Sequence, residues 1–179
     1  MIPNFNISSV LPPFVGADPT LPALCSPYES SMSAFIQRFG TSPERIDILR
    51  GFLAYRSQLN KVGITSGFQI LDGSFVEDCE KIRNRPPNDI DMVTFSYLPI
   101  AGVNVSTFVQ TNLELFDQNL AKNKYKCDAY FIDLGKDSRL IVEDSFYWYG
   151  LFSHQRDTNL WKGMVRIPLM SDDASVRLP

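Results

Sequence analysis

The sequence predicts an α/β protein, taken broadly to include α+β folds, in which helices pack on a sheet. Apolar residues recur every three or four positions in several segments, as on one face of a helix. Short apolar runs bounded by glycine, proline or acidic residues lie between these segments, as expected of strands. After residue 30 the order is α-α-β-α-β-α-β-α-β, which predicts a single domain over 30–179.

The composition agrees with a folded domain. Of 179 residues, 44% are hydrophobic and 12% are aromatic, which is enough for a sizeable core. A chain of this length fits one domain of roughly 100–200 residues.

Residues 1–29 are expected to form an extended, proline-rich arm. They hold 6 of the 12 prolines, and proline removes a backbone donor and disfavours helix in the residue before it. Apolar residues interleave with these prolines. This pattern favours an arm that packs on the core, rather than a flexible tail or a partner-docking peptide.

Two helices are expected to open the domain, the first over about 30–39. The second begins at Pro43, because Ser42 can cap it and Glu44 suits the positive end of a helix. Gly63 is placed to stop it. Four basic residues are expected on its solvated side: Arg45, Arg50, Arg56 and Lys61.

The later elements follow in order along the chain. We expect a strand over 67–72, a helical turn over 75–79, a loop over 80–88, a strand over 89–95, a helix over about 105–121, a strand over 126–134, a helix over about 138–153 and a strand over 162–169. Pro168 favours a sheet edge for the last strand, because proline lacks the N–H of a ladder bond. The aromatic run 146–149 is interpreted as core rather than as a base-stacking platform.

The counts of ionisable residues exclude several kinds of site. One His and three separated Cys cannot build a His-rich metal site or a four-cysteine zinc site. A net charge of -3 argues against a general polyanion binder. The chain has no apolar run of about 20 residues and no signal-peptide pattern. Because its scattered, odd cysteines also suit a reducing compartment, we expect a cytoplasmic protein with no membrane contact.

Carboxylates are therefore the side chains most available to build a functional site. Three sequence features at predicted strand ends indicate where such a site would lie. Gly73-Ser74 follows a strand, where glycine lets a phosphate approach the backbone and serine adds a donor. An ordinary turn is the alternative for this pair. Asp89 and Asp91 are two apart on a strand and so share a face. Such a pair repels unless a cation, typically Mg²⁺, lies between the carboxylates.

The third feature is Asp128, inside an otherwise apolar strand. A buried carboxylate is unfavourable unless it is paired or bound to metal. Asp133, five residues on, points to the opposite face and remains the alternative third carboxylate.

Together these motifs resemble the nucleotidyltransferase superfamily, which includes DNA polymerase β and the minimal nucleotidyltransferases. The matching segments are Leu71-Asp-Gly-Ser-Phe75, Asn88-Asp-Ile-Asp-Met92 and Cys127-Asp-Ala129. The resemblance covers a core over residues 64–135 and implies a mixed sheet flanked by helices.

The resemblance also implies an activity, which is transfer of a nucleotide from a nucleoside triphosphate to a hydroxyl of a protein, an RNA or a small molecule. Gly73 and Ser74 would hold phosphate, and Asp89 and Asp91 would bind two Mg²⁺ ions. Asp128 would be a metal ligand or the base.

Nearly the whole chain further resembles a bacterial family of uncharacterised small proteins assigned to that superfamily. The segments that carry this resemblance are Ile2-Pro-Asn-Phe-Asn6, Leu11-Pro-Pro-Phe14, Ser42-Pro-Glu-Arg45 and Gly73-Ser-Phe-Val-Glu77. Small members of the superfamily often belong to toxin–antitoxin or phage-defence modules. The short length leaves no separate acceptor-binding domain evident, so a homodimer or a partner protein is also expected. Two alternatives remain: a catalytically silent domain that binds nucleotide or a partner, and an unrelated α/β protein whose acids are structural.

Two basic runs lie near these motifs. Lys81, Arg83 and Arg85 could reach a triphosphate or an acceptor polyanion, and a solvated loop is the equal alternative. A second run, Lys122, Lys124 and Lys126, is typical of a helix C-terminus, where cations are favoured, rather than of an RNA contact.

Overall fold

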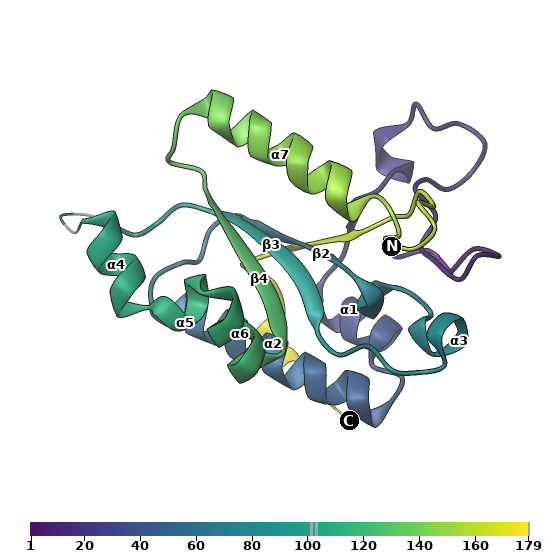
Figure 1. Cartoon of the computed structure of the whole chain (residues 1–179), viewed down its shortest axis with the longest axis horizontal. Helices are drawn as coiled ribbons and strands as arrows, with labels where there is room; N and C mark the ends of the chain where they lie inside the picture. The colour runs from purple at the N-terminus through teal and green to yellow at the C-terminus, as the bar shows by residue number, and fades with distance from the viewer. Residues whose placement is uncertain (101, 103, 179) are drawn as a thin grey trace.

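A computed structural model describes residues 1–100, 102 and 104–178 and has a mixed α/β architecture (Figure 1). Within these residues one five-stranded sheet has the order β1-β5-β2-β3-β4. Its strands are β1 (Tyr28–Glu29), β2 (Phe68–Asp72), β3 (Ile90–Ser96), β4 (Cys127–Asp133) and β5 (Val165–Pro168). The β1–β5 and β3–β4 pairs are parallel and the two pairs that include β2 are antiparallel, so the sheet is mixed. The fold class expected from the sequence is confirmed.

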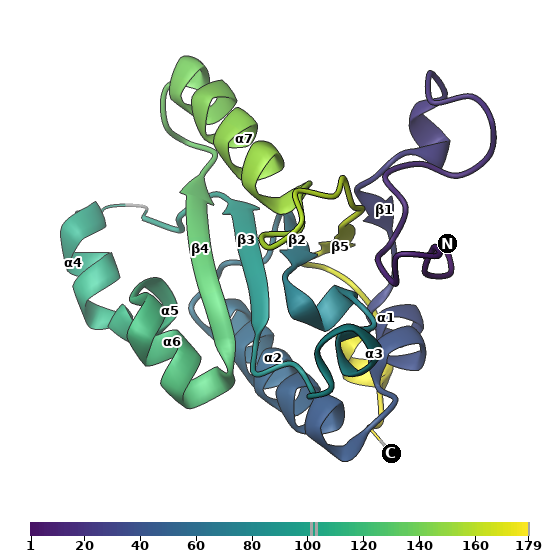
Figure 2. The same ribbon diagram turned by 45° about the vertical axis from the view of Figure 1, so that its right-hand side comes forward.

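Helices cover both faces of the sheet. The described helices are α1 (Met32–Phe39), α2 (Pro43–Lys61), α3 (Cys79–Arg83), α4 (Val105–Thr111), α5 (Leu113–Phe116), α6 (Gln118–Tyr125) and α7 (Ser138–Phe152). The larger core joins one face of the sheet to α1, α2, α5 and α6, and a smaller core lies beneath α7 on the other face (Figure 2). None of the described helices is long and apolar enough to cross a membrane.

Alternation along β3 creates the two cores. Met92 is buried in the larger core, and its neighbour Val93 is buried in the smaller one. Successive side chains of a strand point to opposite faces, so an apolar strand between two layers of helix contributes to both. β3 thus lies between two layers of helix, and its buried side chains fix the position of the strand at whose start the acidic residues lie.

The segment predicted as one helix over 105–121 is broken into α4, α5 and α6. Asn112 ends α4 with φ -119° and ψ 34°, and Asp117 ends α5 with φ -91° and ψ 121°. The side chain of Asp117 accepts a hydrogen bond from the N–H of Leu120 at 2.9 Å and so caps α6. Capping by an Asp side chain competes with helix continuation. The predicted loop over 80–88 is also wrong in part, because α3 occupies its start.

The edge position predicted for the last strand is wrong. β5 lies between β2 and the arm strand β1, which pairs with Val165 and Arg166. The arm therefore supplies an unpredicted outer strand. Pro168 lies beyond this pairing, at the end of β5, where the missing N–H breaks no bond to β1.

Part of the remaining arm packs against the domain, whereas residues 16–23 are exposed. Val10 and Leu11 are fully buried, and Val10 forms a bridge with Glu77. The hydroxyl of Tyr28 donates to the carbonyl of Pro12 at 2.7 Å. These contacts place the arm beside the turn that follows β2.

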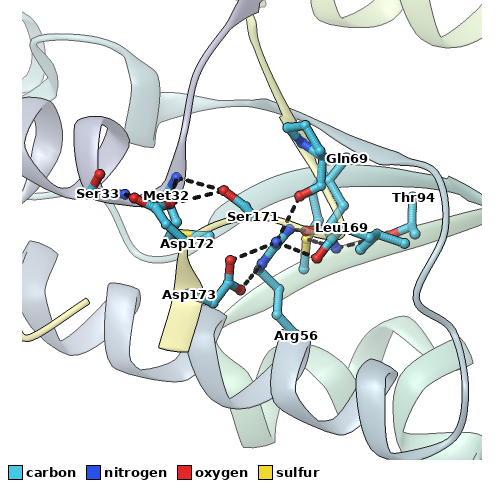
Figure 3. Close-up of polar contacts among 11 residues, drawn as sticks. Met32, Ser33, Arg56, Gln69, Thr94, Leu169, Ser171, Asp172 and Asp173 are labelled. Atoms are coloured by element: carbon cyan, nitrogen blue, oxygen red, sulfur yellow. Dashed lines mark hydrogen bonds and ion pairs between the residues drawn. The ribbon is translucent and has the colours of Figure 1, made fainter. Parts of the chain in front are cut away.

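Two of the four arginines and lysines expected on the solvated side of α2 are instead buried. Arg56 donates to Asp173, to Gln69 Oε1 and to the carbonyls of Pro168 and Leu169 (Figure 3). Arg45 donates to Glu80 and to two backbone carbonyls after β2. A guanidinium offers five donors in a fixed fork, so it can be buried where carboxylates and carbonyls surround it.

The interpretation of the aromatic run on α7 as core is also wrong. Phe146 is 75% exposed and Tyr147 is 63% exposed, while Trp148 packs on Tyr130 with ring centroids 4.3 Å apart. In the two ribbon views α7 lies over the β4 end of the sheet, and none of the described helices lies on its outer side (Figures 1 and 2). Only one stripe of the helix therefore reaches the core.

Acid is expected to weaken the link between the C-terminal segment and α1. Asp172 Oδ1 accepts hydrogen bonds from the backbone N–H groups of Met32 at 2.8 Å and Ser33 at 3.2 Å (Figure 3). Hydrogen bonding, chiefly by Ser33, lowers the pKa of Asp172 from 3.8 to about 2. The ionised carboxylate thus stabilises the fold above about pH 4, and this contribution disappears as pH falls towards 2.

Urea unfolding of the wild type and Asp172→Ala, followed from pH 6 to pH 2, measures this contribution. The stability difference between the two proteins is expected to shrink below pH 4. A difference that stays constant down to pH 2 would contradict the role of the ionised carboxylate.

Candidate active site

Three neighbouring strands bring the Gly-Ser turn and the acidic residues together. In the sheet register Asp72 pairs with Asp91 of β3, and Asp91 pairs with Asp128 of β4. Asp89 immediately precedes β3. The turn after β2 therefore lies at the same end of the sheet as all three predicted carboxylates.

Gly73 packs directly on the carboxylate of Asp91. Its backbone has φ 75° and ψ -164°, a conformation that is essentially confined to glycine. A Cβ added at this position would lie 1.6 Å from Asp91 Oδ2. The turn thus needs glycine both for its backbone shape and for its approach to the acid.

These residues line one cavity of about 810 Å³. Its lining includes Gly73, Ser74, Asp89, Asp91 and Asp128 from the sequence motifs. Arg83, Arg85, His154, Arg156 and Lys162 bring positive or titratable groups to the same cavity. The cavity therefore combines an acidic cluster with basic side chains.

Asp128, and not Asp133, lies with the acidic pair. Asp133 is at the other end of β4, where it pairs with Ser96 in the register. Its Oδ1 accepts a hydrogen bond from the N–H of Gly135 at 2.9 Å, which stabilises the turn after the strand. The structure thus gives Asp133 a local role away from the cavity.

Lys122, from the last turn of α6, reaches into the acidic cluster. Its Nζ lies 2.6 Å from Asp89 Oδ2 and 3.8 Å from Asp128 Oδ2. Across the described ranges no three His, Cys, Asp or Glu side chains are already arranged to hold a metal ion. In this arrangement an ammonium group, rather than a closed ligand cage, neutralises the carboxylates.

A second, buried cluster lies behind the Gly-Ser turn. Lys162 Nζ is 3.0 Å from Asp72 Oδ1 and 2.8 Å from Glu77 Oε1, and all three side chains are almost fully buried. Lys162 Nζ is also 3.4 Å from the carbonyl oxygen of Gly73, and Gln155 donates to Glu77 Oε2 at 3.1 Å. The cluster therefore fixes the backbone from which the turn projects.

Burial raises the pKa values of the two carboxylates closest to the turn, Asp91 and Asp72. Burial, together with the negative charges of Asp89 and Asp128, raises the pKa of Asp91 to about 6. Burial also raises the pKa of Asp72 to about 7, against the opposing effect of Lys162. Asp72 Oδ1 lies near the lysine but has no hydrogen bond of acceptable geometry. A further cation near these two residues would therefore stabilise their ionised forms.

The predicted basic run divides in two. Arg83 and Arg85 line the cavity, and Arg83 Nη2 lies 3.4 Å from Glu77 Oε2 and 3.5 Å from Asp157 Oδ2. Lys81 is exposed on α3 and is not part of the lining. Of the three basic residues predicted as possible triphosphate contacts, only the two arginines therefore remain candidates.

The sequence patterns predicted no acidic partner for Lys122 or for Lys162, which are both site residues. The run at 122, 124 and 126 is placed at the C-terminal end of α6 as predicted, but its lysines contact different acids: Lys124 pairs with Glu114, and Lys126 pairs with Asp47. Lys162 begins the strand predicted over 162–169, whereas β5 itself begins only at Val165.

Comparison with known proteins identifies the family. A model described as a family of unknown function (DUF6932) matches residues 3–168. The chain belongs to this family. No curated protein and no solved structure gives a significant match. The DUF6932 match spans the arm together with the cavity residues, and its description names no activity, so the chemistry has to be argued from the site.

Proposed function

We propose that this DUF6932 chain is a Mg²⁺-dependent nucleotidyltransferase. It would move a nucleotide from a nucleoside triphosphate to a hydroxyl acceptor on a protein, an RNA or a small molecule. The observation that carries the proposal is the register in which Gly73 packs on Asp91 and Asp91 lies beside Asp128. A phosphate-binding turn and its metal-binding carboxylates need this proximity.

The donor set suits Mg²⁺. The cluster offers carboxylate oxygens, and Mg²⁺ is usually held by one or two carboxylates together with waters and substrate phosphates. Asp89 and Asp91 would hold the metal, with Asp128 as a further ligand or the base. Asp72 also lines the cavity, but its buried Oδ1 already has Lys162 Nζ as a cation at 3.0 Å, so it is not counted among the metal ligands. When bound, Mg²⁺ would neutralise phosphate charge and orient the reacting oxygens.

The chain's own residues would position the substrates. Gly73 lets the turn pack against Asp91, Ser74 adds a hydroxyl donor, and Arg83 and Arg85 add positive charge to the cavity. A volume of about 810 Å³ is in the range of small-molecule sites. These features favour binding of a nucleotide with its phosphates near the turn.

In the proposed reaction the acceptor oxygen attacks the α-phosphorus of the nucleotide. The new O–P bond forms as the bond to the pyrophosphate breaks, and pyrophosphate leaves with the bonding electrons. Asp128 accepts the proton of the acceptor hydroxyl. Positioning and charge neutralisation supply most of the rate enhancement in such a transfer.

Loss of either carboxylate of the pair is expected to abolish transfer. Asp89→Asn and Asp91→Asn keep the shape of each side chain but remove a metal-binding charge, so activity should fall about 100-fold or more. The assay incubates each α-labelled nucleoside triphosphate and Mg²⁺ with the protein alone, with tRNA and with cell extract, and follows label on the acceptor.

Asp133→Asn is the matched control, because Asp133 lies on the same sheet but away from the cavity. It should retain wild-type transfer. The proposal fails if no label moves to any acceptor, or if Asp91→Asn transfers label as fast as the wild type.

A catalytically silent domain that binds nucleotide or a partner protein is the second candidate. The exposed aromatic side chains of α7, including Phe146 and Tyr147, favour it, because large exposed apolar patches often mark protein contacts. Calorimetry, read beside the label-transfer assay, separates the two functions. The silent domain binds nucleotide or partner without transfer, and its binding does not change in Asp89→Asn.

A further inference from the structure

Lys122 holds the position that a cation would take in the acidic cluster. Its Nζ faces the Oδ2 atoms of both Asp89 and Asp128, and the side chain lines the cavity. The two carboxylates are 13% and 23% exposed, so their charges are only partly screened by water. The ammonium therefore neutralises carboxylates that would otherwise repel one another.

The position of Lys122 is not required to build α6. Asp117 caps the helix at its start, and Ala121 and Tyr125 bury its inner face. The Lys122 side chain is itself half exposed, and a lysine ammonium is a point charge on a flexible four-carbon stem. The ammonium can therefore leave the carboxylates while the helix stays in place.

A metal ion and this ammonium compete for the same oxygens. Mg²⁺ binds carboxylate oxygen at roughly 2.0–2.1 Å, whereas Asp89 Oδ2 already contacts Nζ at 2.6 Å. Two cations on one oxygen repel each other strongly at such distances. A metal ion that binds Asp89 Oδ2 thus requires the lysine to move.

We propose that Lys122 is a built-in counter-ion of the free site, which a divalent metal displaces and which then turns to the nucleotide phosphates. This inference rests on the proposed function. It implies that the metal alone binds weakly, because it must displace a favourable ion pair. It also implies that nucleotide strengthens metal binding, because phosphate gives the displaced ammonium a new partner.

Mn²⁺ titration followed by electron paramagnetic resonance tests the proposal without an activity assay. Without nucleotide, Lys122→Met is expected to bind Mn²⁺ about tenfold more tightly than the wild type. A non-hydrolysable nucleoside triphosphate should tighten Mn²⁺ binding less in the variant than in the wild type. Circular dichroism checks that the variant is folded, and Lys122→Gln repeats the test with a polar neutral side chain.

Lys124→Met is the matched control. Lys124 lies on the same helix turn but pairs with Glu114, outside the cluster, so its loss should leave Mn²⁺ affinity unchanged. Asp89→Asn identifies the site, because it should weaken the Mn²⁺ binding that Lys122→Met strengthens.

The outcomes distinguish this inference from the proposed function. If Mn²⁺ binds at Asp89 but both neutral Lys122 variants bind it no more tightly than the wild type, the counter-ion role is overturned and the transferase proposal stands. If neither the wild type nor the Lys122 variants bind Mn²⁺ at Asp89, with or without nucleotide, both proposals fail.

Discussion

Replacing Lys162 with methionine is expected to lower the free energy of unfolding by about 3–5 kcal/mol. Lys162 Nζ neutralises Asp72 and Glu77, whose side chains are only 6% and 2% exposed. Methionine fills most of the lysine volume but leaves the two buried carboxylates without their closest cation. Arg83 Nη2, at 3.4 Å from Glu77 Oε2, can compensate only one of them.

Urea denaturation of both proteins at pH 7 measures this loss. Lys124→Met serves as the control, since its exposed ion pair with Glu114 should contribute little to stability. A combined Asp72→Asn, Glu77→Gln and Lys162→Met variant should recover part of the stability, because no uncompensated charge is then buried. A loss below about 1 kcal/mol for Lys162→Met would show that the cluster is not a stabilising ion-pair network.

Local patterns were sufficient to predict most of the elements but not how they assemble. α2 begins where expected because Ser42 accepts a hydrogen bond from the N–H of Arg45 at 3.3 Å, a contact encoded within four residues. The inner position of β5 depends on pairing with β2 and with the distant arm strand β1. Pairing of this kind is decided by tertiary packing, which the pattern of a single segment does not contain.

The same distinction applies to the candidate site. Spacing of two along a strand predicted that Asp89 and Asp91 share a face, which is a local rule. The partners of the lysines follow from no such rule: Lys122 reaches β3 and β4 from α6, and Lys162 reaches the end of β2. The burial of Arg45 and Arg56 was missed for the same reason, since their acceptors belong to distant segments.

The substitution Gly73→Ala is expected to disrupt both the fold around the turn and the site itself. Gly73 has φ 75°, so an L-residue there is strained, and its Cβ would lie 1.6 Å from Asp91 Oδ2. Strain of this kind costs about 1–3 kcal/mol, and the clash forces either the turn or the Asp91 side chain to move. We expect the free energy of unfolding to fall by about 2–4 kcal/mol in urea denaturation.

Gly16→Ala separates the two effects of the alanine at position 73. Gly16 also has a positive φ of 81°, but an added Cβ would meet only Leu24 Cδ1, at an ordinary 3.7 Å. Backbone strain alone should therefore cost about 1 kcal/mol there and leave Mn²⁺ binding intact. Gly73→Ala should lose more stability and also weaken Mn²⁺ binding, because Asp91 is displaced from its place beside Asp128. The prediction is contradicted if both glycine variants lose the same stability and Mn²⁺ binding is unchanged in both. The turn could then move away from Asp91 freely, and the close approach of the turn to this carboxylate would not matter for function.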